Sequence, residues 1–416
     1  MSFDTEKYFD SLDMFGIRLG LDATRELMEK AGHPEKNLRF IHIAGTNGKG
    51  STGAMLERCF RQAGFKTGFY TSPHLIDIRE RFRINGQAVS REEFDRAGKK
   101  LSDRAKEGRY SYFEFATVLA MEIFAAAQTE VVIWETGMGG RLDATNAVMP
   151  QACVITNIAL DHQGHLGNTL AEIAGEKAGI LKAGVPLFHG VLPPEAETVI
   201  LSRARESACP VYPPRATVPE CSDFSKNCQN FIYDGQKFSL SLPGTMQREN
   251  FRIVYEIISY FADKWQFSAA EAFKGLPEVR WPARFQHIGN TIIDGGHNPD
   301  GVRALVDAVK EYHPDEKFLI VYAAFGDKHA PECLKFLDTI AGEYIFTTPG
   351  TGGRAAFAPE QLTAMTAIPS TTEIKPDAAI KLAAKRPDTR VIISGSLYLA
   401  GTASQILCPP EAVLNI

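Results

Sequence analysis

A glycine-rich segment at residues 45–51 has the composition of a phosphate-binding loop. It reads Gly-Thr-Asn-Gly-Lys-Gly-Ser, follows a strand-like apolar run and precedes a helical pattern. Glycines let backbone N–H groups turn towards a polyphosphate, and the amino end of the following helix adds positive potential. In such a loop Lys49 reaches the terminal phosphates, and the Ser51 hydroxyl binds Mg²⁺ or phosphate. Because Gly50 separates lysine from serine, unlike in the usual phosphate loop, an ordinary glycine-rich turn is the alternative.

A carboxylate and an imidazole stand at the ends of two other strand-like runs. Glu135 ends one run before a glycine-rich turn, and His162 follows another run. Ligands gather at the carboxyl ends of parallel strands, and a hard cation such as Mg²⁺ takes oxygen donors. Glu135 and Ser72 offer oxygen, whereas spacing alone does not suggest His162 as a ligand. A glutamate bonded to the backbone and an ordinary loop histidine are the alternative.

The elements that must position these side chains follow from alternating strand-like and helical patterns. Because such alternation produces βαβ units, we expect an α/β fold with a mainly parallel sheet of the P-loop ATPase type. Strands are expected at residues 39–44, 67–71, 131–134, 152–156 and 186–188, with helices at 52–63, 113–127 and 170–181.

The pattern changes near Cys209, where residues 209–245 are rich in Pro, Ser, Cys and Asn. Within this stretch Asp234-Gly235 separates two strand-like runs, which predicts a hairpin at residues 231–242. A long helix is expected to follow at residues 247–264.

The alternation restarts after residues 276–282 (LPEVRWP), which have the composition of a linker. The chain is therefore expected to divide into residues 1–280, which carry the phosphate loop, and residues 281–416, a smaller Rossmann-like α/β domain. The strands of this second domain are expected at residues 291–293, 318–323, 344–347 and 391–394.

Composition and charge exclude several classes of protein. Of the 416 residues, 44% are hydrophobic and 23% charged, as in globular rather than disordered or fibrous proteins. The 45 Lys and Arg against 50 Asp and Glu give a net charge of -5, which disfavours a nucleic-acid partner. No apolar run approaches the roughly 18 residues that span a bilayer, and no signal-peptide pattern is present, so we expect a cytoplasmic protein without a membrane partner. The cysteines form no CxxC pair and indicate buried free thiols.

Further motifs follow the glycine-rich loop along the chain. They are TSPHL at residues 71–75, ER at 80–81, NG at 85–86, FEF at 113–115, ETGMGGRLDATN at 135–146, LDH at 160–162, EKAGI at 176–180, DGGHNP at 294–299 and SGSLY at 394–398. In this order they resemble the folylpolyglutamate synthase/dihydrofolate synthase family of the Mur-ligase superfamily. The resemblance covers residues from about 15 to 402, and such a series is far more specific than any single loop.

The resemblance implies roles for polar residues of the first domain. It also implies that CO₂ carbamylates Lys177, which then supports the metal site as an anion. That chemistry needs a neutral amine, and burial beside a cation would supply it by lowering the pKa of the lysine. Without the resemblance, Lys177 is a helical lysine on a solvated face. The implied ATP contacts are Asn47, Gly48, Lys49, Gly50 and Ser51, the implied Mg²⁺ ligands are Ser72, Glu135 and His162, and Lys49 and Lys177 are implied catalytic groups.

The second domain is expected to complete the ATP site. From just past the linker, the Arg284 guanidinium can reach phosphates across an interdomain cleft. The resemblance implies that Arg284 and Asp294 contact ATP and that His297 is a catalytic group at the reaction centre. Asn250 matches a nucleotide-contacting asparagine, although Met246-Gln247 stands where His-Gln is usual. A linker salt bridge, a turn-forming Asp or Asn and a surface histidine are the alternatives.

Another set of residues matches the pteroate-binding region of the family. An aromatic ring can stack on a flat heterocycle, which favours Phe113 as a contact, whereas Phe115 and Phe124 fit the core face of the same helix. Asp327-Lys328-His329 departs from the frequent Asp-Lys-Asp of the family, and its effect on glutamate binding is left open. The implied pterin contacts are Phe113, Glu114, Leu142, Asp143 and Ala144, with Gly16–Arg18 as further candidates.

The activity that the resemblance implies is ATP-dependent amide formation. A carboxylate is a poor electrophile, so it first attacks the γ-phosphate of ATP, and the amine of L-glutamate then displaces phosphate from the acyl phosphate. The expected acceptor is 7,8-dihydropteroate, tetrahydrofolate or its polyglutamates, or both, and Asp161 with the pteroate region favours a bifunctional enzyme. A Mur-type ligase acting on a UDP-sugar peptide and a non-catalytic nucleotide-binding module are the alternatives. A monomer is expected.

Overall fold

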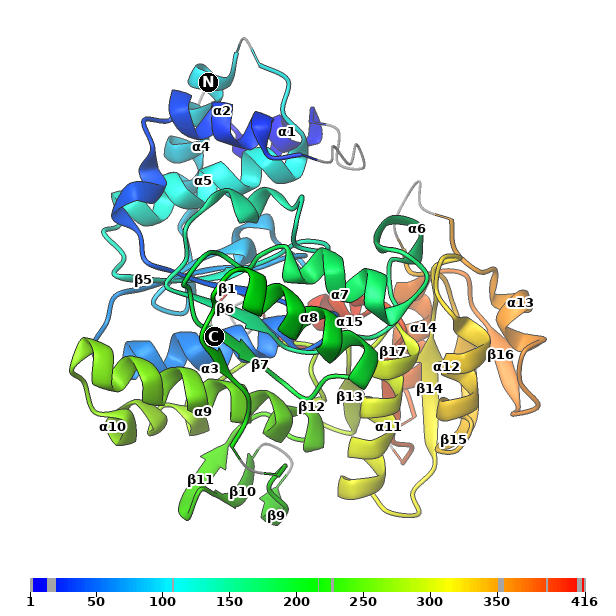
Figure 1. The fold of residues 1–416 in the computed structure, drawn as a ribbon. Coiled ribbons are helices and arrows are strands. Elements are labelled where there is room, and N and C mark those ends of the chain that lie inside the picture. Colours follow the sequence, from blue (N-terminus) through cyan, green and yellow to red (C-terminus); the bar gives the residue numbers. More distant parts are fainter. Residues whose placement is uncertain are drawn as a thin grey trace.

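The computed structural model describes residues 3–12, 20–106, 108–215, 217–225, 228–350, 355–386, 388–409 and 414. These residues form two α/β units, each built on its own sheet, and a small antiparallel sheet attached to the first unit (Figure 1). The candidate pterin contacts Gly16–Arg18 lie outside the described residues. Within the described part of the chain, no helix is both long and apolar enough to cross a membrane.

The sheet of the first unit has eight strands in the order β4-β3-β2-β5-β1-β6-β7-β8. The strands from β2 to β8 in this order run parallel, which confirms the predicted sheet type, and only β3 and β4 pair antiparallel. The short strands β3, β4 and β8 were not predicted, because they lie at the two ends of the sheet and depend on their pairing partners. The strands are β1 (Phe40–Ala44), β2 (Thr67–Tyr70), β3 (Phe82–Ile84), β4 (Gln87–Ala88), β5 (Val131–Glu135), β6 (Ala152–Ile155), β7 (Leu187–His189) and β8 (Val211–Tyr212).

Helices cover both faces of this sheet, which explains why β1 is buried along its whole length. Alternate residues of a strand face opposite sides of the sheet. Ile41 and Ile43 therefore pack in the core between the sheet and α3, whereas Phe40 packs in the core between the sheet and α5. Figure 1 shows α3, α9 and α10 below the sheet and α2, α4 and α5 above it. The helices are α1 (Thr5–Asp10), α2 (Asp22–Lys30), α3 (Lys49–Gln62), α4 (Arg91–Ala105), α5 (Tyr112–Ala126), α6 (Gln163–Leu166), α7 (Leu170–Ala178), α8 (Pro194–Glu206), α9 (Thr245–Trp265) and α10 (Ala269–Phe273).

The stretch rich in Pro, Ser, Cys and Asn forms a three-stranded antiparallel sheet, β9 (Cys221–Ser225), β10 (Cys228–Tyr233) and β11 (Gln236–Leu240). The predicted hairpin is confirmed, because Asp234 and Gly235 form its turn with φ of 48° and 73°. The third strand, β9, was not expected because its sequence is mostly polar. The apolar side of the sheet packs on α9.

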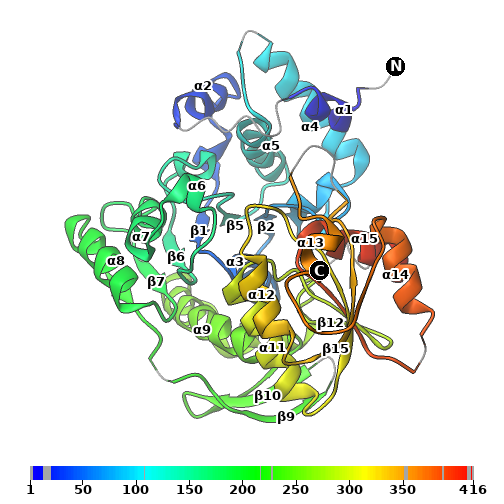
Figure 2. The same cartoon turned by 90° about the vertical axis from the view of Figure 1, so that its right-hand side faces the viewer.

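The second unit is built on a six-stranded sheet in the order β12-β13-β17-β14-β15-β16. Figure 2 shows α11 and α12 in front of this sheet and α14 and α15 to its right. The elements are β12 (Gln286–Ile288), β13 (Thr291–Ile293), α11 (Pro299–Tyr312), β14 (Phe318–Tyr322), α12 (Ala330–Leu337), β15 (Ala341–Phe346), α13 (Pro359–Thr363), β16 (Ser370–Thr372), α14 (Pro376–Ala384), β17 (Val391–Ser394) and α15 (Leu397–Leu407).

The chain passes from one apolar core to the other within a few residues. Leu276 and Val279 are fully buried in the core of the first unit, and Trp281 packs against it. Ala283 already belongs to a core of the second unit. The segment 276–282 is therefore packed rather than free in solvent, and the division between residues 280 and 281 stays a prediction.

All seven cysteines are free thiols. Cys59, Cys153, Cys209 and Cys333 are buried, which confirms the predicted buried thiols, and the other three are partly exposed. Burial raises the pKa of the Cys333 thiol to about 11, so this thiol is protonated at neutral pH.

His42 makes the stability of the first unit sensitive to acid. It is fully buried in β1, and burial lowers its pKa to about 3. Below the ordinary histidine pKa of about 6.5, the unfolded chain gains a proton that the folded chain does not. The free energy of unfolding therefore decreases as the pH is lowered. We expect the wild-type protein to lose about 2 kcal/mol more than His42→Asn between pH 7 and about pH 5. Urea unfolding at both pH values measures this, and equal losses would contradict it.

Candidate active site

The glycine-rich loop joins β1 to α3, and the helix begins inside the loop at Lys49 rather than at Thr52. Gly48 makes this early start possible because its φ of 83° lies in the left-handed region. An added Cβ on Gly48 would also come 2.5 Å from the side-chain oxygen of Asn250. Residues 49–51 therefore form the first turn of α3, whose free N–H groups suit phosphate oxygens.

Two lysines from different elements converge on one carbonyl group of this loop. The Lys49 ammonium donates to the carbonyl oxygens of Gly45 at 3.0 Å and Thr46 at 3.3 Å. The Lys177 amine, in the last turn of α7, donates to the same Gly45 oxygen at 2.9 Å. Burial and the charge of Lys49 lower the pKa of Lys177 to about 7. A substantial fraction of Lys177 is therefore a neutral amine at neutral pH, and the solvated-face alternative is wrong because the side chain is buried.

A cleft of about 840 Å³ lies between the two units. The first unit lines it with the phosphate loop, the ends of β5 and β6, and the first turns of α9. The second unit contributes residues 294–297, the beginning of α11 and the loop before α12. The cleft contains every residue that the sequence assigned to ATP, the metal or catalysis, namely Asn47, Gly48, Lys49, Gly50, Ser51, Ser72, Glu135, His162, Lys177, Asn250, Arg284, Asp294 and His297.

The oxygen donors expected to hold Mg²⁺ lie side by side in the cleft. Glu135 is the last residue of β5, and its carboxylate accepts hydrogen bonds from the Thr71 hydroxyl and, at 3.4 Å, from the Ser72 backbone N–H. Burial raises the pKa of Glu135, while the charge of Lys49 opposes this. A divalent cation would compensate this buried carboxylate, so its surroundings fit a metal ligand.

His162 also lines the cleft, with a φ of 52° in the left-handed region. Burial lowers its pKa to about 4, so the imidazole is neutral at pH 7 and its ring nitrogens are free of the extra proton that prevents metal binding. Within the described ranges, no cluster of three or more His, Cys, Asp or Glu side chains could hold a metal. A cation here would therefore depend on Ser72 and on phosphate or water oxygens besides Glu135 and His162, which is how Mg²⁺ is usually bound.

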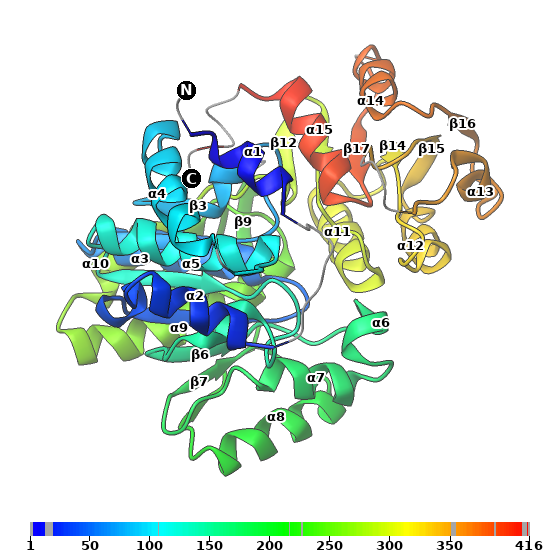
Figure 3. The same ribbon diagram turned by 90° about the horizontal axis from the view of Figure 1, so that it is seen from above.

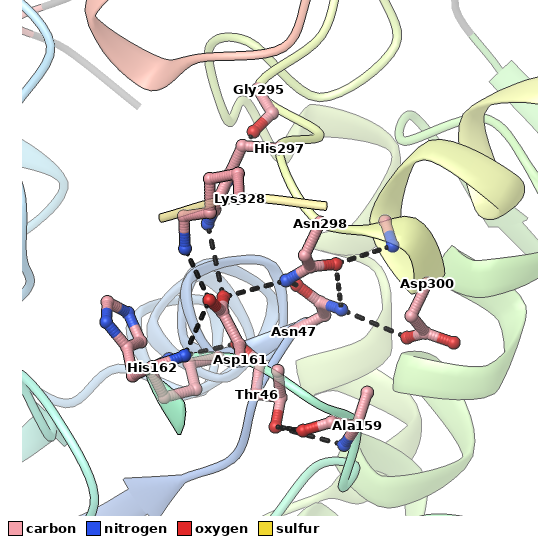
Figure 4. A network of polar contacts seen from close by, with 12 residues as sticks. Thr46, Asn47, Ala159, Asp161, His162, Gly295, His297, Asn298, Asp300 and Lys328 are labelled. Atoms are coloured by element: carbon pink, nitrogen blue, oxygen red, sulfur yellow. Dashed lines mark hydrogen bonds and ion pairs between the residues drawn. The ribbon is translucent and has the colours of Figure 1, made fainter. Parts of the chain in front are cut away.

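Asp161 connects the two units at the centre of the cleft (Figure 4). Its carboxylate forms a buried ion pair with Lys328 and accepts a hydrogen bond from Asn298 at 2.9 Å. The His297 Nε2 lies 3.5 Å from the same carboxylate, and the His162 backbone N–H donates to it at 2.8 Å. Burial alone would raise the pKa of Asp161, but His297 and the neighbouring cations hold it well below its ordinary range. Asp161 is consequently a fixed negative charge that holds parts of the second unit.

A cluster of amides makes a second connection across the cleft. Figure 4 shows the Asn47 side chain pointing away from the loop towards the second unit. Its amide nitrogen donates to Asn298 at 3.1 Å and to Asp300 at 3.0 Å, and its oxygen accepts from Asn298 at 3.1 Å. Asn157 also donates to Asp300 at 3.0 Å. The Asn47 side chain thus binds protein groups, and its backbone N–H also donates to the Asn157 side-chain oxygen, at 2.7 Å.

Arg284 and Asp294 face each other at the start of the second unit. The Asp294 carboxylate is buried and accepts from the backbone N–H groups of Phe285 at 2.9 Å and Gly296 at 2.7 Å. Burial raises the pKa of Asp294, and the charge of Arg284 opposes this. The Arg284 guanidinium donates to the Ala283 carbonyl at 2.8 Å and lines the cleft.

His329, which stands where an aspartate is frequent, also bridges the two units. Its Nε2 lies 2.7 Å from the side-chain oxygen of Gln163, the first residue of α6. Figure 3 shows the short α6 reaching towards the second unit. His329 therefore adds an exposed contact beside the buried pair of Lys328 and Asp161.

The residues expected to bind a pterin lie outside the cleft wall. Phe113 is partly exposed at the start of α5, with its ring 6.1 Å from that of Tyr70. Glu114 is buried and accepts from the Ser111 backbone N–H at 2.7 Å, which completes the capping box at the start of its own helix. Phe115 is fully buried in the core, as predicted.

Asp143 shapes the loop after β5 through hydrogen bonds to the backbone. Its carboxylate accepts from the N–H groups of Gly137 at 3.0 Å, Met138 at 2.8 Å and Thr145 at 3.0 Å. Ala144 is buried beside it, and Leu142 is partly exposed. The pterin assignment of these residues stays a prediction.

Comparisons with known proteins agree with the two-unit architecture. The Mur ligase middle domain matches residues 43–201, and the Mur ligase glutamate ligase domain matches residues 283–397. The dihydrofolate synthase/folylpolyglutamate synthase of Bacillus subtilis is 34% identical over 92% of this chain and 94% of its own length. The chain belongs to this family. A second member, the folylpolyglutamate synthase of Lacticaseibacillus casei, is 30% identical over 92% of each protein.

Solved structures of the family have the same fold. The folylpolyglutamate synthase of Mycobacterium tuberculosis, complexed with ADP and AMPPCP, superposes with a TM-score of 0.86 at 28% identity over 97% of both chains. Escherichia coli FolC, in complex with DHPP and ADP, gives a TM-score of 0.84 at 26% identity over 96% of both chains. Both agree with the predicted mainly parallel sheet and separate carboxyl-terminal α/β unit.

The sequence did not assign a role to several residues that connect the two units. Asn298, Asp300 and Lys328 lie within or beside motifs that were recognised only as family markers, and Asn157 lies in none. The available signal was an aspartate in the LDH motif and a lysine in the DKH motif, but these two residues are 167 positions apart in the chain. Pairing at that separation is decided by the fold.

Proposed function

We propose that this chain uses ATP to join L-glutamate both to 7,8-dihydropteroate and to tetrahydrofolate or its polyglutamates. ATP-dependent glutamate ligation to folates is the activity of the family to which the chain belongs. The observation that carries the proposal is that the phosphate loop and the turn of the glutamate ligase domain face each other across one cleft. That arrangement brings a phosphorylated carboxylate and an amine together.

The residues of the cleft support the two chemical steps. Lys49 and Arg284 supply positive charge from opposite sides, which favours attack of the acceptor carboxylate on the γ-phosphate. The amine of glutamate then attacks the acyl phosphate, an amide forms and phosphate leaves. We place His297 at this second step because it lines the cleft beside Asp161. Two units enclosing the cleft exclude the water that would hydrolyse the intermediate.

We propose that Mg²⁺ is held by Ser72, Glu135 and His162, whose donors fit a cation as described above. When bound, the metal neutralises charge on the transferring phosphoryl group. We further propose that Lys177 is carbamylated and supports this site, because its buried amine has a pKa of about 7. The carbamate forms when the neutral amine attacks CO₂ and releases a proton.

The proposed binding region for the pterin acceptor lies in the first unit. We retain Phe113, Glu114, Leu142, Asp143 and Ala144 as the proposed pterin region, with Asp143 acting through the shape of its loop. Free cysteines suit a reducing compartment, so we place the protein in the cytoplasm. We propose a monomer, which sedimentation velocity would test.

A product assay tests the proposed function. Purified protein is incubated with ATP, Mg²⁺ and labelled glutamate, and with either dihydropteroate or tetrahydrofolate as acceptor. We expect amide products and ADP release with both acceptors, each dependent on glutamate. Product with only one acceptor would restrict the activity to that acceptor and would contradict the bifunctional proposal.

Two control reactions separate the alternatives. ADP release with a UDP-muramoyl peptide acceptor, and none with pterins, would identify a Mur-type ligase of cell-wall precursors. Absence of turnover with every acceptor, in protein that still binds ATP, would indicate a non-catalytic nucleotide-binding module.

A further inference from the structure

Helix α11 is attached to the first unit at both of its ends. At its beginning, Asn298 and Asp300 bind the phosphate loop through the amide cluster drawn in Figure 4. At its end, Glu311 and Tyr312 contact the first unit near the small antiparallel sheet. Figure 2 shows α11 between α9 and the sheet of the second unit, with β9 and β10 beneath its end. The contacts of Glu311 and Tyr312 do not involve any residue that takes part in phosphoryl transfer or amide formation.

The contacts at the end of α11 converge on Arg248 of α9. Its side chain is 5% exposed, and its Nη2 donates to Glu311 at 2.7 Å and to the Thr245 hydroxyl at 3.0 Å. Its Nη1 donates to the Gln229 side-chain oxygen at 2.5 Å, and its Nε donates to the Pro219 carbonyl at 2.9 Å. Thr245 also donates to Glu311 at 3.0 Å. We call this set of contacts the Arg248 joint.

Gln229 of β10 extends the joint into the small sheet. It is fully buried, and its amide nitrogen donates to the carbonyl oxygens of Leu242 at 2.6 Å and Gly244 at 3.2 Å. The Tyr312 hydroxyl donates to the Gln229 oxygen at 3.3 Å and accepts from the Gly244 N–H at 3.3 Å. The ring of Phe224 lies 4.3 Å from that of Tyr312. These bonds fix the small sheet against the second unit. The stretch rich in Pro, Ser, Cys and Asn thus helps to hold the two units together, a role that the sequence did not predict.

The backbone approaches α11 closely at Gly244. Its φ of 102° favours glycine, and an added Cβ would lie 3.2 Å from the Ala308 Cβ and 2.5 Å from the Met246 sulfur. Met246 itself packs against the apolar core of the second unit. The first turn of α9 is thus inserted between the two units and held by packing as well as by hydrogen bonds.

The same turn forms a wall of the cleft. Gln247 and Asn250 of α9 line it from the first unit, and Arg303 and Asp307 of α11 line it from the second. We propose that Arg248 is a positioning residue, and that the Arg248 joint sets the register of the glutamate ligase domain over the phosphate loop. A buried arginine with partners on both sides defines one geometry because leaving any donor unpaired is costly.

The inference rests on the proposed ligation, and it predicts a specific failure. An acyl phosphate must meet the amine before it meets water, so a shift of the second unit lets water hydrolyse it. Loss of the joint should therefore raise the number of ADP molecules released per amide formed. A purely structural role would instead lower the amount of folded enzyme and leave this ratio unchanged.

The experiment compares Arg248→Met, Glu311→Gln and the double variant with wild type. Glu311 is partly exposed, so its variant keeps the fold if Arg248→Met fails to fold. Arg203→Met is the matched control, because Arg203 forms an exposed ion pair with Glu206 on α8. The measurements are ADP and amide released, and energy transfer between dyes at the exposed positions Arg205 on α8 and Leu382 on α14.

We expect wild type and the control to release one ADP per amide, from the stoichiometry of the reaction. In Arg248→Met and Glu311→Gln, amide formation should fall about tenfold while ADP release falls less, and the dye distance should change. The double variant should be no worse than the poorer single variant, because the two residues act through one contact. An unchanged ratio with an unchanged distance in folded variants overturns the proposal. Absence of amide in wild type would instead contradict the proposed function.

Discussion

The Lys49→Ala variant is expected to lose ligase activity, with kcat/KM lower by about 1,000-fold or more. Phosphoryl transfer depends on neutralising charge on the transferring group, and Lys49 supplies a cation from the first turn of α3. Among the described residues, its ammonium donates hydrogen bonds only to the carbonyl oxygens of Gly45 and Thr46, and its charge also acts on Glu135 and Lys177. Removing it should leave the packing of the first unit intact, so the loss falls on catalysis.

Steady-state kinetics with saturating glutamate measures this effect, and thermal unfolding verifies that the variant is folded. Lys99→Ala is a matched control because Lys99 forms an exposed ion pair with Asp103 on α4. Near-normal turnover in a purified, folded Lys49→Ala protein would contradict the role assigned to this lysine.

The Lys177→Ala variant is expected to lower kcat/KM by about 100-fold, because supporting groups around a metal typically contribute that much. Lys177 is buried against the Gly45 carbonyl, and burial with the charge of Lys49 lowers its pKa to about 7. A carbamate at this position would supply an anion where the protein otherwise places two lysines. Lys177→Ala removes the anion together with the amine.

The pH dependence follows from the direction of that shift. Above about pH 7 the Lys177 amine is mostly neutral and can react with CO₂, whereas below about pH 7 it is mostly protonated and cannot. Enzyme depleted of CO₂ should therefore be activated by bicarbonate at about pH 8, with the activation declining towards about pH 6. Lys177→Ala should show no activation at either pH.

Electron density at Lys177, from crystals grown with bicarbonate, is the direct observation. Intact-mass measurement is a poorer choice because the carbamate is labile. A bare lysine side chain in that density, or wild-type activity indifferent to bicarbonate, would rule out carbamylation.

Much of the fold was determined by local sequence. The runs at residues 39–44 and 131–134 match β1 and β5 almost residue for residue, because a short apolar run that ends at a glycine-rich turn is typical of a buried strand. The Asp234-Gly235 turn was equally local, since both residues accept a positive φ. The short strands and the start of α3 at Lys49 were not, because they depend on pairing partners and on the space left by Asn250.

The sequence by itself predicted which residues carry the chemistry, and the structure places every ATP, metal and catalytic candidate along one cleft. Only the tertiary structure decided how the two units are held together. The partners Asp161 with Lys328 and Arg248 with Glu311 lie far apart along the chain, and each side chain alone has the pattern of an ordinary surface charge. Burial of Asp161, Lys328 and Arg248 makes these pairings specific, because a charge removed from water requires a partner of fixed geometry, and only the folded chain brings that partner near.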